Sequence, residues 1–316
     1  MVEIIPLWVV NLLSFITVFS VMAAIGTTIV PSVFIQHLRS PFLLIRGLIN
    51  VLVIVPIVGF ATTFAFGLSL PEQVGVVLMV IAPGAPLALR RALGSGGDAG
   101  FAPTLQIAVA ILAVPAVPLW VVVGNWILGT HGFADAMAVA RQVFLAQLLP
   151  LALGAIVRRV ASARGARIGR VLGRVGAFLL IAALISILVN VRYSILLTHF
   201  WPIVCVAITT IAALAAGHIL GSPSPEIRHA MAIAGAMRNL GLALLVATAN
   251  QTPPEVEVVI VSYAITAVVI VSVYIVWWTK DNTGNFGRGR PYLMRINGKR
   301  RKAAGTYPPE TRLWSL

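Results

Sequence analysis

Long apolar stretches, separated by short polar or basic segments, follow one another along almost the whole chain. Each is long enough to cross about 30 Å of hydrocarbon as a helix. The stretches are continuous and lack the alternation that a membrane β-barrel strand requires. The pattern therefore predicts an all-α polytopic membrane protein with nine transmembrane helices, near residues 5–28, 42–66, 72–90, 101–127, 136–157, 173–191, 199–220, 227–249 and 257–278.

The third apolar stretch is irregular. It contains Pro83, Gly84 and Pro86 within a few residues of one another. A proline removes a backbone donor and clashes with the carbonyl four residues earlier, so the helix should break near the middle of the membrane. Broken backbone at that depth is stable only inside protein or beside a water-filled cavity. A kinked packing helix would have the same sequence.

The eighth stretch places Arg238 about a dozen residues from either end, roughly 18 Å along a helix. A guanidinium at that depth costs at least about 2.5–3.5 kcal/mol unless it faces protein or water. No acidic residue occurs at matching depth in another predicted span. We therefore expect Arg238 to face a cavity and to interact with carbonyls, water or an anion. A structural role, capping carbonyls of an interrupted helix, is the alternative.

Composition agrees with the pattern. Hydrophobic residues make up 59% of the 316 positions and charged residues only 10%, with a mean hydropathy of +0.98. Such values place the chain among membrane proteins, in which its 19 prolines and 27 glycines are tolerated. The five histidines are scattered and Cys205 is the only cysteine, so neither a metal site nor another cofactor is expected.

The basic residues predict the orientation. With the N-terminus outside, the inner loops and the tail hold nineteen of the 23 lysines and arginines, Arg90 and Arg91 among them. We therefore expect a multi-pass protein of the plasma membrane, the inner membrane if the cell has two, with a cytoplasmic C-terminus. The tail 279–316 is expected to be basic and disordered. Its basic run "GKRRKAA" has no interleaved aromatic residues and no fold around it, so no nucleic-acid partner is expected.

Two segments resemble motifs of the bile acid:sodium symporter superfamily. In that family the irregular helix of the first half often reads P-G-G-T-x-S-N followed by G-D, and this chain keeps Pro83, Gly84 and the pair Gly97–Asp98 in "APGAPLALRRALGSGGD". The matching helix of the second half commonly reads E-x-x-x-Q-N-x-G-L. Here the segment is "AGAMRNLGL", in which Asn239, Gly241 and Leu242 match.

The resemblance implies inverted repeats and two crossing discontinuous helices inside a core domain, against which a panel domain moves. On this chain the transporter domain would cover residues 1–278. The core would comprise approximately residues 42–127 and 199–278, and the panel residues 5–28 and 136–191.

Several positions depart from the family pattern. Ala88 and Leu89 stand where the family places a sodium-binding serine and asparagine, and Ala234 and Arg238 stand where it places a glutamate and a glutamine. Alanine and leucine offer no oxygen ligands, and a guanidinium would repel a nearby cation. We therefore expect no sodium coupling. Arg238 would supply permanently the positive charge that relatives obtain from bound sodium.

The leading interpretation is a secondary transporter that moves a small organic anion across the bilayer by alternating access. Its predicted substrate-binding residues are Arg238, Asn239, Pro83, Gly84, Gln106 and Thr104. One alternative is a sensor or scaffold that binds an anion without flux. A second is an arsenite-type exporter, which Cys205 disfavours because it lies outside both irregular helices. An enzyme is not expected, because no serine–histidine or paired-aspartate arrangement is visible at matching depth. The sequence does not indicate the oligomeric state.

Overall fold

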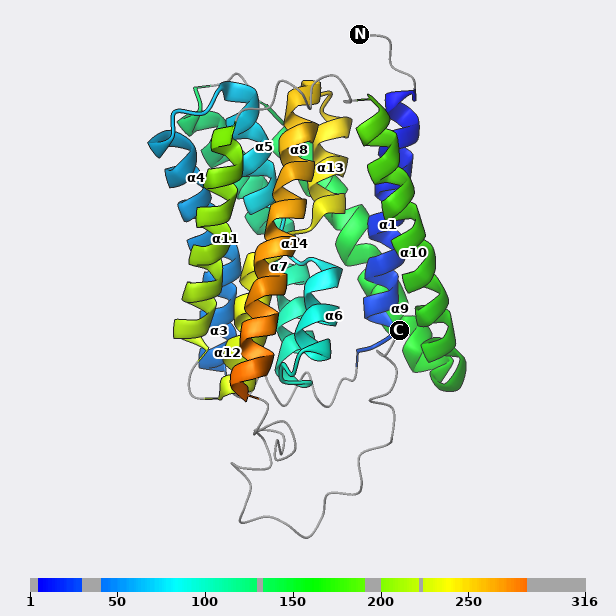
Figure 1. The fold of residues 1–316 in the computed structure, drawn as a ribbon. Coiled ribbons are helices and arrows are strands. Elements are labelled where there is room, and N and C mark those ends of the chain that lie inside the picture. The colour runs from blue at the N-terminus through cyan, green and yellow to red at the C-terminus, as the bar shows by residue number, and fades with distance from the viewer. Residues whose placement is uncertain (1–4, 30–40, 130–132, 191–199, 222–223, 283–316) are drawn as a thin grey trace.

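The computed structural model describes residues 5–29, 41–129, 133–190, 200–221 and 224–282, and all the regular structure in these ranges is helical (Figure 1). The predicted tail 279–316 lies almost entirely outside them. In chain order the α-helices and two π-helices (η) are α1 (Leu7–Gly26), α3 (Pro41–Ile49), η1 (Asn50–Ile54), α4 (Val55–Ala65), α5 (Leu70–Val80), α6 (Pro86–Gly94), α7 (Phe101–Ile127), α8 (Ala136–Val143), η2 (Phe144–Leu148), α9 (Leu149–Val160), α10 (Ser162–Asn190), α11 (Phe200–Leu220), α12 (Pro225–Ala236), α13 (Leu240–Ala249) and α14 (Pro254–Asn282).

Eight helical segments of the described chain are long and apolar enough to cross a membrane: Trp8–Gly26, Pro41–Ala65, Phe101–Ile127, Ala136–Val160, Arg167–Asn190, Phe200–Leu220, Pro225–Ala249 and Pro254–Asp281. The predicted third span is missing from this set because it consists of two short helices, α5 with 11 residues and α6 with nine. The all-helical membrane class is therefore confirmed, whereas the count of nine transmembrane helices is not.

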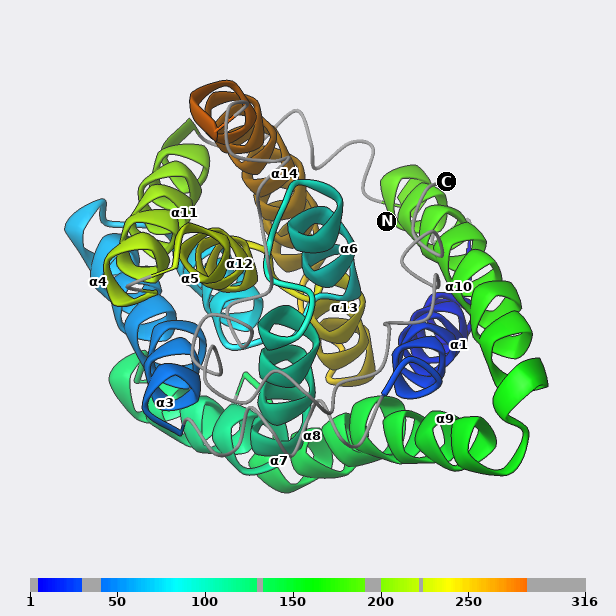
Figure 2. The same ribbon diagram turned by 90° about the horizontal axis from the view of Figure 1, so that it is seen from below.

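The outer surface of the bundle is apolar. Large side chains such as Phe178 and Ile219 are 71% and 77% exposed. Exposure of this kind over many helices is unfavourable in water and suits a lipid environment. The opposite holds for Pro225–Ala249, the span formed by α12 and α13, of which 89% is buried. This span lies at the centre of the molecule when it is viewed along the helices (Figure 2).

Helices α1, α9 and α10 pack together on one side of the molecule (Figure 2). The remaining helices surround α12 and α13, and α1 reaches across to contact α13. The predicted division into a core and a panel is compatible with this arrangement but stays a prediction, as do the inverted repeats.

Two glycines allow α1 and α9 to approach closely. A β-carbon placed on Gly154 of α9 would lie 2.1 Å from the carbonyl oxygen of Ala23, and one on Gly26 of α1 would lie 2.2 Å from the carbonyl oxygen of Leu151. Small residues at a helix–helix contact are the usual way in which membrane helices gain van der Waals contact. Any side chain at either position must therefore separate the two helices.

We expect Gly154→Ala to lower the stability of the protein by about 1–3 kcal/mol, because it overfills this contact. The measurement is the melting temperature of the detergent-solubilised protein. Gly94→Ala is the matched control, since a β-carbon there meets no atom within 4 Å. Equal melting temperatures for the two variants would contradict the packing described.

Candidate functional site

The first irregular segment separates α5 from α6. Helix α5 ends at Val80, Gly84 has a φ of +80°, and Ala85 is extended before Pro86 begins α6. Glycine adopts a positive φ at little cost, and proline is well suited to the first turn of a helix. The predicted break near Pro83 is therefore confirmed, and its sequence explains where one helix ends and the next begins.

Two glutamines lie beside this break. Gln106 of α7 donates its amide Nε2 to the carbonyl oxygen of Gly84 over 2.7 Å. Gln147 of η2 approaches the same glycine, because a β-carbon on Gly84 would lie 3.1 Å from its Nε2. Gln147 is completely buried, and neither of its amide atoms bonds to another described residue. Gln147 was not predicted, because its only signal in the sequence is a polar residue inside an apolar span.

The second irregular segment separates α12 from α13. Helix α12 ends at Ala236, and Met237 is extended with a ψ of 123°. Asn239 then caps α13, since its side-chain Oδ1 accepts a hydrogen bond from the amide of Leu242 over 3.2 Å. Asparagine is a favoured N-cap residue. Residues 237–239 include neither proline nor glycine, so the position of this break follows from the asparagine cap and from its surroundings.

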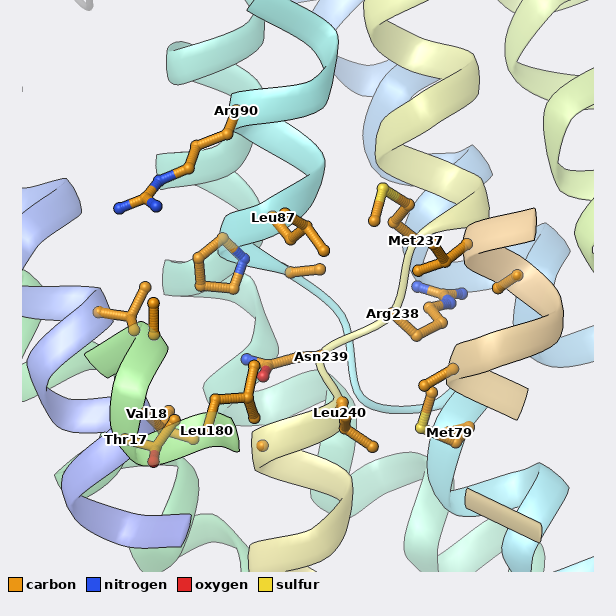
Figure 3. A pocket seen from close by; sticks show the side chains of 18 of the residues that line it. Thr17, Val18, Met79, Leu87, Arg90, Leu180, Met237, Arg238, Asn239 and Leu240 are labelled. Carbon is orange, nitrogen blue, oxygen red and sulfur yellow. The ribbon is translucent and has the colours of Figure 1, made fainter. Parts of the chain in front are cut away.

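The two breaks are bonded to each other. The amide of Asn239 donates to the carbonyl oxygen of Ala82 over 2.9 Å, and the two extended segments pass beside each other (Figure 3). Helices α6 and α13 therefore begin near the same point deep in the bundle. Helix N-termini carry partial positive charge and free amides, so together they favour an anion.

Arg238 is only 5% exposed and donates its Nη2 to the carbonyl oxygen of Val51 over 2.9 Å. The π-helix η1 makes that carbonyl available, because the amide of Val55 bonds to Asn50 instead of Val51. Nε and Nη1 have no hydrogen-bond partner among the described residues. The Tyr263 hydroxyl is close enough to interact with the charge without a hydrogen bond of normal geometry. The side chains of Arg238 and Asn239 leave the chain on opposite sides (Figure 3).

A cavity of about 170 Å³ lies between the second break and the α1–α10 pair (Figure 3). Arg238 and Asn239 line it, together with Ala85, Pro86, Leu87 and Arg90 from the start of α6. Apolar residues of α1, α10 and α14 complete the wall. Arg90 was assigned from the sequence to membrane orientation alone, and its place in this wall was not predicted.

The other predicted site residues stand behind the cavity or away from it. Pro83 and Gly84 belong to the first break and Gln106 holds it, but none of the three is among the lining residues. Thr104 donates its hydroxyl to the carbonyl oxygen of Gly100, the N-cap residue of its own helix α7. The structure thus brings Arg238 and Asn239 together at the cavity, and the role of all six residues in substrate binding stays a prediction.

The positions at which the resemblance would place sodium ligands are apolar here. Ala88 and Leu89 of α6 are buried at 2% and 3% exposure. Among the described residues no three His, Cys, Asp or Glu side chains lie close enough to hold a metal ion. The expectation that the protein binds no sodium stays a prediction.

A serine–histidine pair that was not predicted from the sequence lies near the end of α6. The Oγ of Ser95 is 2.6 Å from Nε2 of His229. The same hydroxyl donates to the carbonyl oxygen of Arg91 over 2.6 Å. A hydroxyl has one proton, so His229 must donate to Ser95 rather than accept from it. This is the reverse of nucleophile activation, and the pair instead joins the end of α6 to α12.

Two comparisons with known proteins bear on this arrangement. The family model described as "Sodium Bile acid symporter family" matches residues 15–196, which is more than half of the chain. A curated relative from Bacillus subtilis (strain 168), named "Uncharacterized sodium-dependent transporter YocS", is 25% identical over 253 residues, covering 76% of this chain and 75% of its own length.

We expect Gln106→Met to destabilise the protein by about 1–3 kcal/mol, because the buried carbonyl of Gly84 loses its donor while side-chain volume is nearly unchanged. Gln73→Met is the matched control. It removes a bond of the same length, to the carbonyl of Leu68, at a partly exposed position. Melting temperatures of the two variants check this, and an equal or smaller loss for Gln106→Met would be contrary to the expectation.

Proposed function

Since the chain belongs to the sodium bile acid symporter family and is a transmembrane transporter, we propose that it is a secondary transporter that carries a small organic anion by alternating access. The observation that favours an anionic substrate is the positive charge of the cavity wall. Its wall contains two arginines and no carboxylate among the described lining residues. The N-termini of α6 and α13 add their positive ends.

Asn239 supports a ligand at this place. The residue is 4% exposed, and its Nδ2 donates to no described residue. A buried donor without an acceptor costs about 1–3 kcal/mol. An anionic oxygen in the cavity would satisfy it, and the Oδ1 that caps α13 would hold the amide group in the required orientation.

Unequal exposure along the cavity supports alternating access. Leu87 and Arg90 are exposed, whereas Thr17 and Gly241 are buried. Beyond Thr17, the buried Oγ of Ser14, one turn earlier on α1, also has no hydrogen-bond partner in the described chain. Water could satisfy these unpartnered hydroxyls of α1 in a second conformation, in which the cavity opens along this helix. In this movement the predicted core domain, residues 42–127 and 199–278, would move against the predicted panel domain, residues 5–28 and 136–191.

The proposed orientation has the N-terminus outside the plasma membrane and the C-terminus in the cytoplasm. Helix α1 begins at one end of the bundle and α14 ends at the opposite end (Figure 1). An odd number of crossings is required for this, so α5 and α6 together would make the ninth. The cavity would then open towards the cytoplasm, because its exposed residues lie on α6, near the end at which α14 finishes.

Transport is proposed to be independent of sodium, although the relative described above is named as sodium-dependent. The guanidinium of Arg238 already binds the Val51 carbonyl, an oxygen that a cation could otherwise use. Two unit charges 4 Å apart repel by about 4 kcal/mol at an effective dielectric constant of 20. Sodium beside Arg238 is therefore unfavourable, and the arginine would supply its charge permanently.

An arsenite-type exporter is the weaker candidate. Cys205 is buried in α11, where its Sγ donates to the carbonyl oxygen of Thr62 over 3.4 Å. It is not among the residues that line the cavity. A thiol in that position cannot bind an oxyanion in this cavity, so we retain the organic anion.

Transport itself is tested with purified protein. We expect at least one carboxylate or sulfonate to raise the melting temperature equally in sodium and in potassium buffer. The same anion should enter or exchange across protein-containing vesicles in sodium-free buffer. Binding without flux would identify a sensor or scaffold instead, and flux that requires sodium would disprove the proposed coupling.

The role of Arg238 is tested by restoring the family's residues. In the double variant Arg238→Gln, Ala234→Glu, which leaves Ala88 and Leu89 in place, we expect anion uptake in sodium-free buffer to fall at least about tenfold, because the permanent positive charge is lost; this corresponds to 1.4 kcal/mol. Arg141→Gln, at an exposed arginine of α8, is the matched control and should stay independent of sodium. Intact, sodium-independent uptake in the double variant would refute the role proposed for Arg238.

A further inference from the structure

The cavity wall has a second charged side chain besides Arg238, that of Arg90 of α6. Arg90 lies one turn along α6 from Pro86 and Leu87, and all three line the cavity (Figure 3). Residues three and four apart share one face of a helix. Arg90 therefore lies on the same face of α6 as Pro86 and Leu87, the face that lines the cavity. It makes no hydrogen bond or ion pair with another described residue that would occupy its donors.

Helix α10 leaves room for this guanidinium. A β-carbon placed on Gly173 would lie 2.5 Å from Nη2 of Arg90. The arginine therefore lies directly against the α10 backbone at a position where any larger residue would displace it. Contact between α6 and α10 at this point closes one side of the cavity with a positive charge.

The two arginines of the wall are not equivalent. Arg238 is buried, donates to Val51 and points away from the side on which Asn239 lies. Arg90 is exposed and keeps its fork of donors free for a ligand. A charge-assisted, bidentate contact to a carboxylate or sulfonate is therefore open to Arg90.

The remaining wall limits the rest of the ligand. Apart from Arg90, Arg238, Asn239 and Thr17, the lining is apolar or glycine, and includes Val18, Val21, Met79, Leu180, Met237 and Val268. A cavity of about 150 Å³ accommodates benzene, and this one measures about 170 Å³. A second carboxylate against the apolar part of that wall, away from Arg238 and Asn239, would be buried without a partner, which is costly. A four-ring bile salt is larger than the space.

We propose that Arg90 binds the charged group of the substrate, and that the substrate is a monoanion whose apolar body is about the size of one six-membered ring. This inference rests on the proposed anion transport and assigns its charge-binding residue and substrate class. Arg90 at the exposed side and Asn239 at the buried side would both contact the anionic group or its path into the cavity.

The test measures binding to full-length protein in lipid nanodiscs by calorimetry, with benzoate, its neutral analogue benzamide, the dianion phthalate and taurocholate as probes. We expect wild-type protein to bind benzoate more tightly than the other three. Arg90→Gln should weaken benzoate binding at least about tenfold and abolish the preference over benzamide. Arg90→Lys should retain part of that preference. Arg91→Gln is the matched control, one residue away and outside the cavity, and should bind as wild type does.

The outcomes separate this inference from the proposed function. Equal benzoate binding by Arg90→Gln and Arg91→Gln would overturn the role of Arg90 while leaving anion transport intact. Preference for taurocholate or phthalate, or no binding of benzoate by wild-type protein, would overturn the substrate class. Failure of anion flux in vesicles would instead remove the proposed function. Unliganded melting temperatures show whether each variant is folded, and the ratio of benzoate to benzamide affinity reports charge recognition separately from stability.

Discussion

Every backbone amide and carbonyl inside a bilayer must find a partner within the protein, and this constraint governs the centre of the molecule. Two helical segments are interrupted midway, between α5 and α6 and between α12 and α13, and the second break supplies an amide to the first. The bond from the amide of Asn239 to the carbonyl of Ala82 joins them. Gln106 satisfies Gly84 from a neighbouring helix. The breaks are thus stable only as a pair, and their crossing brings two helix N-termini to one cavity.

The same constraint explains the π-helix opposite Arg238. Pro56 has no amide, so the carbonyl of Leu52 is free and accepts the indole Nε1 of Trp120 over 2.8 Å. The π-helix frees the neighbouring carbonyl of Val51 as well, and Arg238 takes it. A buried charge and an irregular helix therefore compensate each other, and neither would be favourable alone.

The membrane class and the break at Pro83 could be predicted because local sequence determines both: long apolar runs in one case, two prolines and a glycine in the other. The break at Met237–Asn239 could not be located from residue types, since nothing in that segment forbids a helix. The position of Arg238 in the middle of an apolar span correctly indicated that its side chain is enclosed by protein. It could not indicate the direction in which the guanidinium points. The places of Arg90 and Gln147 beside the cavity and the first break became visible only in three dimensions, because the glycines that they approach, Gly173 and Gly84, lie far away in sequence.

The π-helix η1 also fixes the rotational register of its span. It contains one residue more than an α-helical turn would, so the face presented by Pro41–Ile49 is turned by about 100° relative to a regular helix continuing from α4. Loss of one residue there would restore regular geometry, yet it would withdraw the Val51 carbonyl and rotate every contact below it. The extra residue of η1 thus sets the direction in which the side chains of Pro41–Ile49 point. The number of residues in η1 is therefore as constrained as their identity.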